Sequence, residues 1–351
     1  MRPNGLHLNL NRRALESLGV YVFLLIILAI MAVVSPQSMT TGHLLDLVRQ
    51  AAPLGVLAVG QTLALLVGGI DLSVEAVITL TNVVAAALMA AGDQTIPSAL
   101  LFVLTIAAAV GTINGLAVAK LKIPPFIATL AMGTVIQGGY LVYTHGSPTG
   151  KIAPGFRVIA EGWIGGLPVA GLIWAVVVIL VAILLRRTGF GRRLYATGGN
   201  PQTARLSGIP VTRVLVLSYA LTSVLAAGAG LLLSAYIGLA SMSVGAGYGL
   251  NSIAAVVIGG TSFAGGQGGL SGTIAGALVM VLLQSLLTMM NVGEPGRLVM
   301  QGLVIAGMVA VYQLRGARRG RARAGGPWPS VDPQRSASGQ DYRAGSEGSG
   351  P

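Results

Sequence analysis

The chain is a succession of long apolar blocks separated by short polar connections. Each block is about as long as the run of roughly 20 apolar residues that a helix needs to cross a bilayer core about 30 Å thick. We therefore predict membrane-spanning helices along most of the chain. Their predicted ranges are 18–34, 44–68, 72–91, 97–119, 125–144, 164–185, 213–234, 249–260, 268–290 and 297–314.

This pattern predicts an all-α fold, a polytopic transmembrane helical bundle of about ten spans. The block at residues 249–260 is short and bounded by glycines, so it favours a broken helix over a complete crossing. A broken helix is tolerated in a membrane only where neighbouring protein or a cavity satisfies the freed backbone groups.

Composition supports the membrane interpretation and excludes several functions. Of the 351 residues, 54% are hydrophobic and only 9% are charged, whereas soluble domains carry about 25% charged residues. The net charge of +12 does not indicate nucleic-acid binding, because Lys and Arg lie between apolar blocks and in the C-terminal segment rather than along one surface helix. With no Cys and three scattered His residues, we expect no metal site.

The positions of the positive charges predict the orientation, since connections rich in Lys and Arg stay in the cytoplasm. With both termini cytoplasmic, all but four of the 22 Lys and Arg residues face the cytoplasm; the exceptions are Arg49, Lys151, Arg157 and Arg297. We expect residues 1–17 to be a cytoplasmic segment, 18–315 the transmembrane domain, and 316–351 a disordered cytoplasmic tail. The Arg cluster of the tail is expected to lie beside anionic membrane lipid.

The 51 glycines of the chain include runs of small residues at a spacing of four. These positions are Gly111 and Gly115; Ala226, Gly230, Ser234 and Gly238; and Gly268, Gly272 and Gly276. In lipid, small residues let helix backbones approach closely, so packing is the simplest interpretation. A direct role in a substrate path is the alternative.

One candidate functional segment interrupts the apolar run at residues 60–77, GQTLALLVGGIDLSVEAV. After Gly68 and Gly69, Asp71 and Ser73 are both predicted to cap a following helix, with Asp71 and Glu75 on one helix face. Capping at the cytoplasmic interface, a translocation path or gate, and a metal or proton site all remain open, because acids near a membrane usually have a partner or a function. Residues 67–73 also weakly echo residues 258–263, as in transporters with repeated interrupted helices.

A second candidate is the longest predicted cytoplasmic connection, TGFGRRLYATGGNPQTARLSGI at residues 188–209. Asn200 followed by Pro201 is typical of an N-cap with Pro at the first helical position, and Ser207 with Gly208 would end the helix. The pattern predicts a short helix over residues 201–206. It is either held to lipid headgroups or a docking helix for a cytoplasmic partner.

These two segments, together with AAVVIGGTSFAGGQGGLSGTIAGAL at residues 254–278, resemble the ribose-type sugar permeases of ATP-binding-cassette (ABC) importers over residues 44–314. The resemblance implies a transport subunit in the bacterial plasma (inner) membrane that works as a dimer with a second copy or a paralogue. A separate cytoplasmic ATPase would bind ATP and Mg, and an extracytoplasmic binding protein would deliver a simple, ribose-like sugar.

Two sets of candidate site residues follow. The resemblance places the ATPase-coupling helix at residues 200–208, and the coupling-loop residues are Gly198, Gly199, Asn200, Pro201, Ala204, Arg205, Ser207 and Gly208. The candidate translocation path or gate consists of Gly68, Gly69, Asp71, Ser73, Asn114, Thr129, Gly259 and Gly260. Plausible hydrogen-bond partners for a neutral sugar are Thr62, Thr79, Thr81, Asn82, Asn114, Thr129, Thr134 and Gln137.

The sequence lacks the Gly-rich loop ending in Gly-Lys-Ser/Thr that binds ATP phosphates, and it has no specific catalytic triad or carboxylate pair. We therefore expect no catalytic residue and no cofactor in this chain. An ion-coupled secondary transporter of a small polar solute is the alternative function, and it would need an embedded acid such as Asp71 or Glu75.

Overall fold

The computed structural model describes residues 8–300, 302–303 and 306–307, with side chains from Gly19 onward. The chain divides into two compact units, Met1–Gln301 and Gly302–Pro351, and the description below concerns the first. The described α-helices are α1 (Leu8–Val34), α2 (Thr41–Leu66), α3 (Val74–Met89), α4 (Ile96–Ala119), α5 (Pro125–Thr144), α6 (Pro154–Glu161), α7 (Val169–Arg187), α8 (Gly189–Gly199), α9 (Pro201–Leu206), α10 (Val211–Ile237), α11 (Tyr248–Ile258) and α12 (Leu270–Met289). Two short 3-10 helices, η1 (Pro36–Met39) and η2 (Asp93–Thr95), and one hairpin, β1 (Trp163–Ile164) with β2 (Leu167–Pro168), are also present, and residues 294–300 are helical.

The helical bundle that the apolar pattern predicts is confirmed. The first nine predicted spans each coincide with a helix, and the tenth, at residues 297–314, lies mostly outside the described residues. Five helical segments in the described part are long and apolar enough to cross a membrane: Asp93–Ala119, Pro125–Thr144, Val169–Arg187, Val211–Ile237 and Leu270–Met289. The predicted tail at residues 316–351 also lies outside the described residues.

The structure corrects the prediction at two connections. The span predicted from residue 164 begins only at Val169, because residues 163–168 form the hairpin. The connection after α7, predicted to contain one short helix, contains a second one, α8. Its glycines disfavour a helix locally, but Leu194 is fully buried and Gly191 packs closely on the end of α7, so tertiary packing outweighs local preference.

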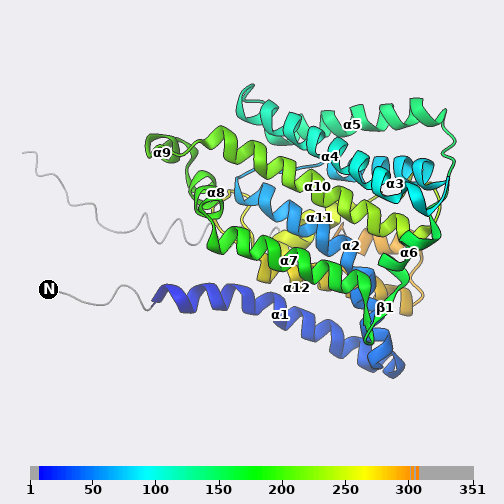
Figure 1. Ribbon diagram of the computed structural model, residues 1–351. Helices are drawn as coiled ribbons and strands as arrows, with labels where there is room; N and C mark the ends of the chain where they lie inside the picture. The colour runs from blue at the N-terminus through cyan, green and yellow to red at the C-terminus, as the bar shows by residue number, and fades with distance from the viewer. Residues whose placement is uncertain (1–7, 301, 304–305, 308–351) are drawn as a thin grey trace, which may run out of the picture. The chain divides into compact units, whose positions relative to one another are not determined.

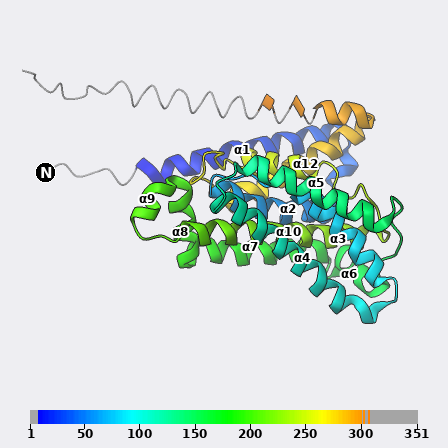
Figure 2. The same cartoon turned by 90° about the horizontal axis from the view of Figure 1, so that it is seen from above.

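Helix α10 lies at the centre of the bundle, where it packs against α2, α3 and α4 (Figure 1). The helices run roughly parallel to one long direction, with α8 and α9 at one end and α6 with β1 at the opposite end. Figure 2 shows the same separation from above. We call these the α9 end and the α6 end of the bundle.

The close packing predicted for the small residues is confirmed between α4 and α10. A Cβ atom at Gly111 would lie 2.3 Å from the carbonyl oxygen of Tyr219, and one at Gly115 would lie 2.5 Å from the Cα of Val216. Higher residue numbers on α4 meet lower numbers on α10, so the two helices are antiparallel. Backbones in such contact leave no room for a side chain, which is why glycine is required at these positions.

Replacing Gly111 by Ala should therefore destabilise the protein, because the added methyl group meets backbone atoms that cannot move away alone. Overpacking of this kind costs about 1–3 kcal/mol. Thermal unfolding of the detergent-solubilised protein should show a lower midpoint for Gly111→Ala. Gly19→Ala is the matched control, since a Cβ atom there meets nothing within 4 Å. Equal midpoints for the two variants would contradict the packing argument.

Candidate functional site

The helical path is interrupted between α2 and α3. Helix α2 ends at Leu66, Gly68 takes a positive φ of 78°, and α3 begins only at Val74. The N–H of Gly69 donates to the carbonyl of Ala64, so the chain turns back beside the helix that it has just left. Residues 70–72 thus run without helical hydrogen bonds inside the bundle, where each backbone group requires another partner.

Neighbouring side chains supply those partners. The side-chain nitrogen of Gln61 donates to the C=O of Asp71 at 3.3 Å, and its side-chain oxygen accepts from the N–H of Asp71 at 3.2 Å. The hydroxyl of Thr129 on α5 accepts from the N–H of Leu72 at 3.1 Å. Gln61, Asp71 and Thr129 are all fully buried. The break is therefore held by side chains from α2 and α5.

Asp71 fixes the turn into α3. Its Oδ1 accepts from the N–H of Ser73 at 2.9 Å and from the Ser73 hydroxyl at 2.6 Å, and that hydroxyl accepts from Nδ2 of Asn114 at 2.9 Å. The expected side-chain cap is wrong for Ser73, whereas Asp71 does accept a backbone N–H, that of Ser73, at the start of α3. Ser73 occupies the N-cap position of α3 without a side-chain capping bond, and Asp71 precedes the helix, so Asp71 and Glu75 do not share a helix face.

The structure thus brings Asp71, Ser73, Asn114 and Thr129 of the predicted path into one buried cluster. Gly69 of the predicted path lies in the same segment and packs on the hydroxyl of Tyr219, since a Cβ atom at Gly69 would lie 2.1 Å from that oxygen. All of these side chains are at most 1% exposed. In this conformation the cluster positions the backbone, and it does not line an open passage.

A second interruption precedes α11. After α10, residues 239–247 run beside α3 without forming a helix, and Asn82 holds their beginning. Its Oδ1 accepts from the N–H of Ser241 at 2.7 Å, and its Nδ2 donates to the carbonyl of Leu239 at 3.2 Å. The Thr79 hydroxyl accepts from the N–H of Gly245 at 3.2 Å. Asn82 and Thr79, considered above as sugar contacts, thus bind backbone in this structure.

The broken helix predicted at residues 249–260 is confirmed as α11, which has 11 residues. Gly259 packs against α12, since a Cβ atom there would lie 2.4 Å from the carbonyl carbon of Gly272, and Gly260 takes a positive φ of 86°. These two glycines of the predicted path therefore allow a close helix contact and a tight turn.

The three segments singled out in the sequence meet at one backbone junction. The N–H of Gly266 donates to the carbonyl of Leu66 at 2.9 Å, and a Cβ atom at Gly198 would lie 1.8 Å from that carbonyl oxygen. The Tyr195 hydroxyl donates to the carbonyl of Gly268 at 3.0 Å. We call Leu66, Gly198 and Gly266 the glycine junction; it joins α8 to the end of α2 and to the turn before α12.

The short helix predicted at residues 201–206 is confirmed as α9, Pro201–Leu206. Asn200 caps it by accepting from the N–H groups of Gln202 and Thr203, each at 3.0 Å, and Gly208 takes the expected positive φ. Ala204 is buried, whereas Gly199, Asn200, Pro201, Arg205, Ser207 and Gly208 are exposed. Leu206 is 85% exposed, so α9 presents an apolar side chain with no cover in the described part of the chain.

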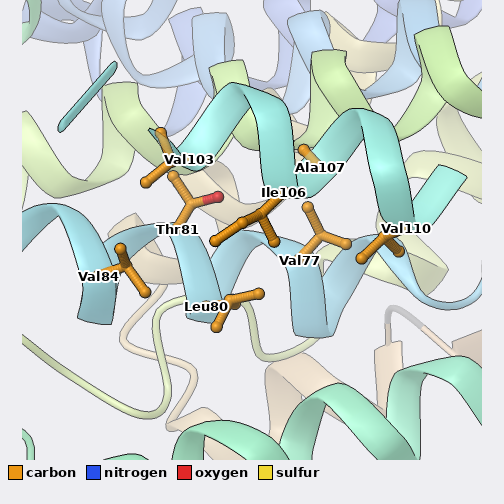
Figure 3. Close-up of a pocket in the computed structure, with 8 residues that line it drawn as sticks. All are labelled: Val77, Leu80, Thr81, Val84, Val103, Ile106, Ala107 and Val110. Carbon is orange, nitrogen blue, oxygen red and sulfur yellow. The ribbon is translucent and has the colours of Figure 1, made fainter. Parts of the chain in front are cut away.

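Figure 3 shows a hollow between α3 and α4, with Thr81 as its one polar lining residue among Val77, Leu80, Val84, Val103, Ile106, Ala107 and Val110. Its volume of about 10 Å³ is at the lower limit for a single water molecule. It is too small to accept a solute. Among the described residues, no group of three or more His, Asp or Glu side chains could hold a metal ion.

Sequence reasoning missed Gln61 and Tyr219 as parts of the site. A signal was available for Gln61, because a polar residue in the middle of an apolar run needs a partner. None was available for Tyr219, since only the fold shows that its hydroxyl lies beside Gly69.

Comparisons with known proteins agree with this architecture. Residues 43–310 match the family described as branched-chain amino acid transport system / permease component. The ribose import permease protein RbsC of Bacillus subtilis is 39% identical over 83% of this chain and 91% of its own length, and that of Escherichia coli K12 is 37% identical over 81% and 89%. The galactose/methyl galactoside import permease protein MglC of Escherichia coli K12 is 33% identical over 86% and 95%. No solved structure gives a significant match.

Replacing Gln61 by Leu tests the role of side chains at the first break. The N–H and C=O of Asp71 would lose their partners, and each buried unsatisfied group costs about 1–3 kcal/mol. Thermal unfolding of the solubilised protein should begin at a clearly lower temperature for Gln61→Leu. Gln37→Leu replaces the same side-chain amide at an exposed position, so the midpoint temperature of its thermal unfolding should stay at the wild-type value. If the two variants melt alike, another group satisfies Asp71.

Proposed function

This chain belongs to the branched-chain amino acid transport system / permease component family and is the membrane subunit of a sugar ABC importer, and from this premise we propose how it works. Its cargo is a simple monosaccharide of the ribose type. The observation that carries this choice is the identity of 37–39% with two ribose import permeases over most of each chain. The chain is a multi-pass protein of the inner membrane and a transport subunit rather than an enzyme.

We place the α9 end in the cytoplasm. The described Lys and Arg residues of the connections at this end are Lys120, Lys122, Arg186, Arg187, Arg192, Arg193, Arg205 and Arg213. The cations near the α6 end are few, and Arg157 and Arg297 there form ion pairs with Glu161 and Glu294. Positive charge accumulates on the cytoplasmic side of membrane proteins, which supports this orientation.

A cytoplasmic ATPase docks on α9. The support is the exposure of Leu206 and Arg205 on a short helix whose start is fixed by Asn200. ATP and Mg are bound by that partner, and this chain supplies the surface on which the partner acts.

The glycine junction transmits the movement of the ATPase. Gly198, at the end of α8, is in backbone contact with Leu66 and Gly266. A movement of α9 therefore reaches the end of α2 and the turn before α12 through main-chain contacts, without crossing a flexible side chain. Rigid-body shifts of packed elements between two discrete arrangements are a common basis of switching. The buried cluster around Asp71 then acts as a joint that changes the position of α3, which is how these residues serve as a gate.

The sugar path lies between two copies of the chain. Thr134 and Gln137 on α5 remain exposed, in contrast to Thr62, Thr79, Asn82, Asn114 and Thr129, whose side chains bond within the bundle. An exposed hydroxyl and an exposed amide on a helix in lipid are favourable if a second copy covers them around a polar path. An extracytoplasmic binding protein delivers the sugar at the α6 end.

The orientation can be tested with single cysteines, because the natural chain has none. In spheroplasts, a membrane-impermeant maleimide should label Trp163→Cys in the hairpin and should label Arg205→Cys on α9 only after permeabilisation. The control is the unmodified chain, which should not react. Labelling of Arg205→Cys in intact spheroplasts would place the docking helix on the wrong side and overturn the proposal.

The docking role predicts that Gly199→Arg and Leu206→Asp weaken association with the ATPase by about tenfold or more, as expected for an interface residue worth about 1.4 kcal/mol or more. A Cβ atom at Gly199 meets nothing within 4 Å, so the fold should tolerate this change. Leu167→Asp in the hairpin is the control. Co-purification of the ATPase and ATP-driven ribose uptake in proteoliposomes should fall together in the α9 variants.

Normal association in both α9 variants would contradict the docking role. Uptake that continues without ATP and stops when the proton gradient is removed would instead support an ion-coupled transporter.

A further inference from the structure

A second cavity, of about 330 Å³, lies between the helices of a single copy of the chain and is open to the outside, since Gln50, Tyr236, Ala246 and Gln284 of its lining are exposed. Its lining comes from α2, α6, α7, α10, α11 and α12, and from Ala246 just before α11. The residues are Arg49, Gln50, Pro53, Leu54, Ala160, Ala170, Leu232, Leu233, Tyr236, Ala246, Tyr248, Asn251, Val281 and Gln284. We infer that this cavity is a binding site for one small, neutral, polyhydroxylated molecule, a monosaccharide. The inference rests on the proposed function for the choice of sugar.

The cavity lies toward the α6 end. Its α2 residues belong to the first half of that helix, and its α10 residues belong to the last turns. Ala160 lies on α6 itself. In the proposed orientation this is the side from which a sugar arrives. The buried cluster around Asp71 lines no part of the cavity, so the two sites are separate.

The size of the cavity suits a small solute. Sites for small molecules begin at about 300 Å³. At about 30 Å³ for each water molecule, this space holds on the order of ten waters, enough to be replaced by one sugar ring and its hydroxyl groups.

The charge of the lining favours a neutral ligand. Arg49 is the one charged residue of the lining, and its guanidinium is paired with Asp46 at 3.1 Å and lies 5.5 Å from the centre of the Tyr236 ring. Because Asp46 compensates the charge, an anion would gain little net attraction. The Nε of Arg49 is buried and has no hydrogen-bond partner among the described residues.

The polar groups of the lining match the hydroxyls of a sugar. Gln50 and Gln284 each carry amide donors and an acceptor, the combination that a hydroxyl group can use in both directions. Pro53 has no N–H to give to the carbonyl of Arg49, four residues earlier, so that carbonyl lacks its helical donor beside the cavity. Together, these amides, the Arg49 carbonyl and the Arg49 Nε give the cavity both hydrogen-bond donors and hydrogen-bond acceptors.

Apolar side chains form the remaining walls. Pro53, Leu54, Leu232, Leu233 and Val281 can cover the C–H faces of a ring, and Tyr236 and Tyr248 add aromatic surface. A lipid acyl chain would offer no hydrogen bond to the exposed amides of Gln50 and Gln284 or to the buried Nε of Arg49, which is unfavourable for polar groups that it removes from water. A compact molecule with both hydroxyl groups and C–H faces satisfies the whole lining.

The test measures binding of tritiated D-ribose and D-galactose to the full-length chain in lipid nanodiscs, without ATPase or binding protein. The wild type should bind at least one sugar saturably. Gln284→Leu should weaken that binding by about tenfold, the loss expected for one hydrogen bond to a sugar hydroxyl. Ala246→Trp, which fills the cavity, should abolish it. Gln37→Leu, at an exposed position outside the cavity lining, is the control and should bind as the wild type does.

No saturable binding of either sugar by the wild type, or equal binding by the wild type and Ala246→Trp, would overturn the inference. Thermal unfolding of each variant distinguishes loss of the site from loss of the fold, and Gln50→Leu serves as a second test if Gln284→Leu does not fold. ATP-driven uptake by the assembled importer separates the two proposals. Import without binding to the isolated chain overturns only the cavity site, whereas cavity binding without ATP-driven import supports the site and contradicts the proposed function.

Discussion

The fold depends on one constraint: every backbone N–H and C=O that leaves a helix inside the bilayer must find a partner within the protein. In the described part of the chain, two of the non-helical segments, residues 67–73 and 239–247, meet the constraint in the same way. Gln61 and Thr129 hold the first segment, and Asn82 and Thr79 hold the second. These polar side chains in apolar helices fix where α3 and α11 begin, and therefore where the glycine-rich turns meet.

The two breaks are related in space. Residues 241 and 245 bond to Asn82 and Thr79, so the second irregular segment runs antiparallel to α3. The glycine turns with weakly similar sequences also lie against each other, because Gly266 bonds to Leu66 and a Cβ atom at Gly265 would lie 2.7 Å from the nitrogen of Gly68. The helical part of one span thus lies beside the irregular part of the other, an arrangement known from transporters with repeated elements.

Much of this architecture follows from the sequence, because hydrophobic length and cap residues act locally. The apolar blocks predict the helices, and Asn200-Pro201 predicts the start of α9. Helix α8 does not follow, because its stability comes from Leu194 and from contacts of Gly191 and Gly198 that are distant along the chain. The predicted path includes Asp71, Asn114 and Thr129 but not Gln61. The sequence does not show how these residues pair, since their side chains converge on one segment only in three dimensions.

In the mechanism that we propose, the contact of Gly198 with Leu66 and Gly266 separates recognition from force transmission. The residues proposed to meet a partner, from Gly199 to Ser207, are mostly exposed, whereas the contact behind them is made of main chain and leaves no room for a side chain at Gly198. Under this proposal, a lineage of such importers could exchange one energy-supplying partner for another by altering a few surface positions, while the contact that moves the membrane helices stays the same.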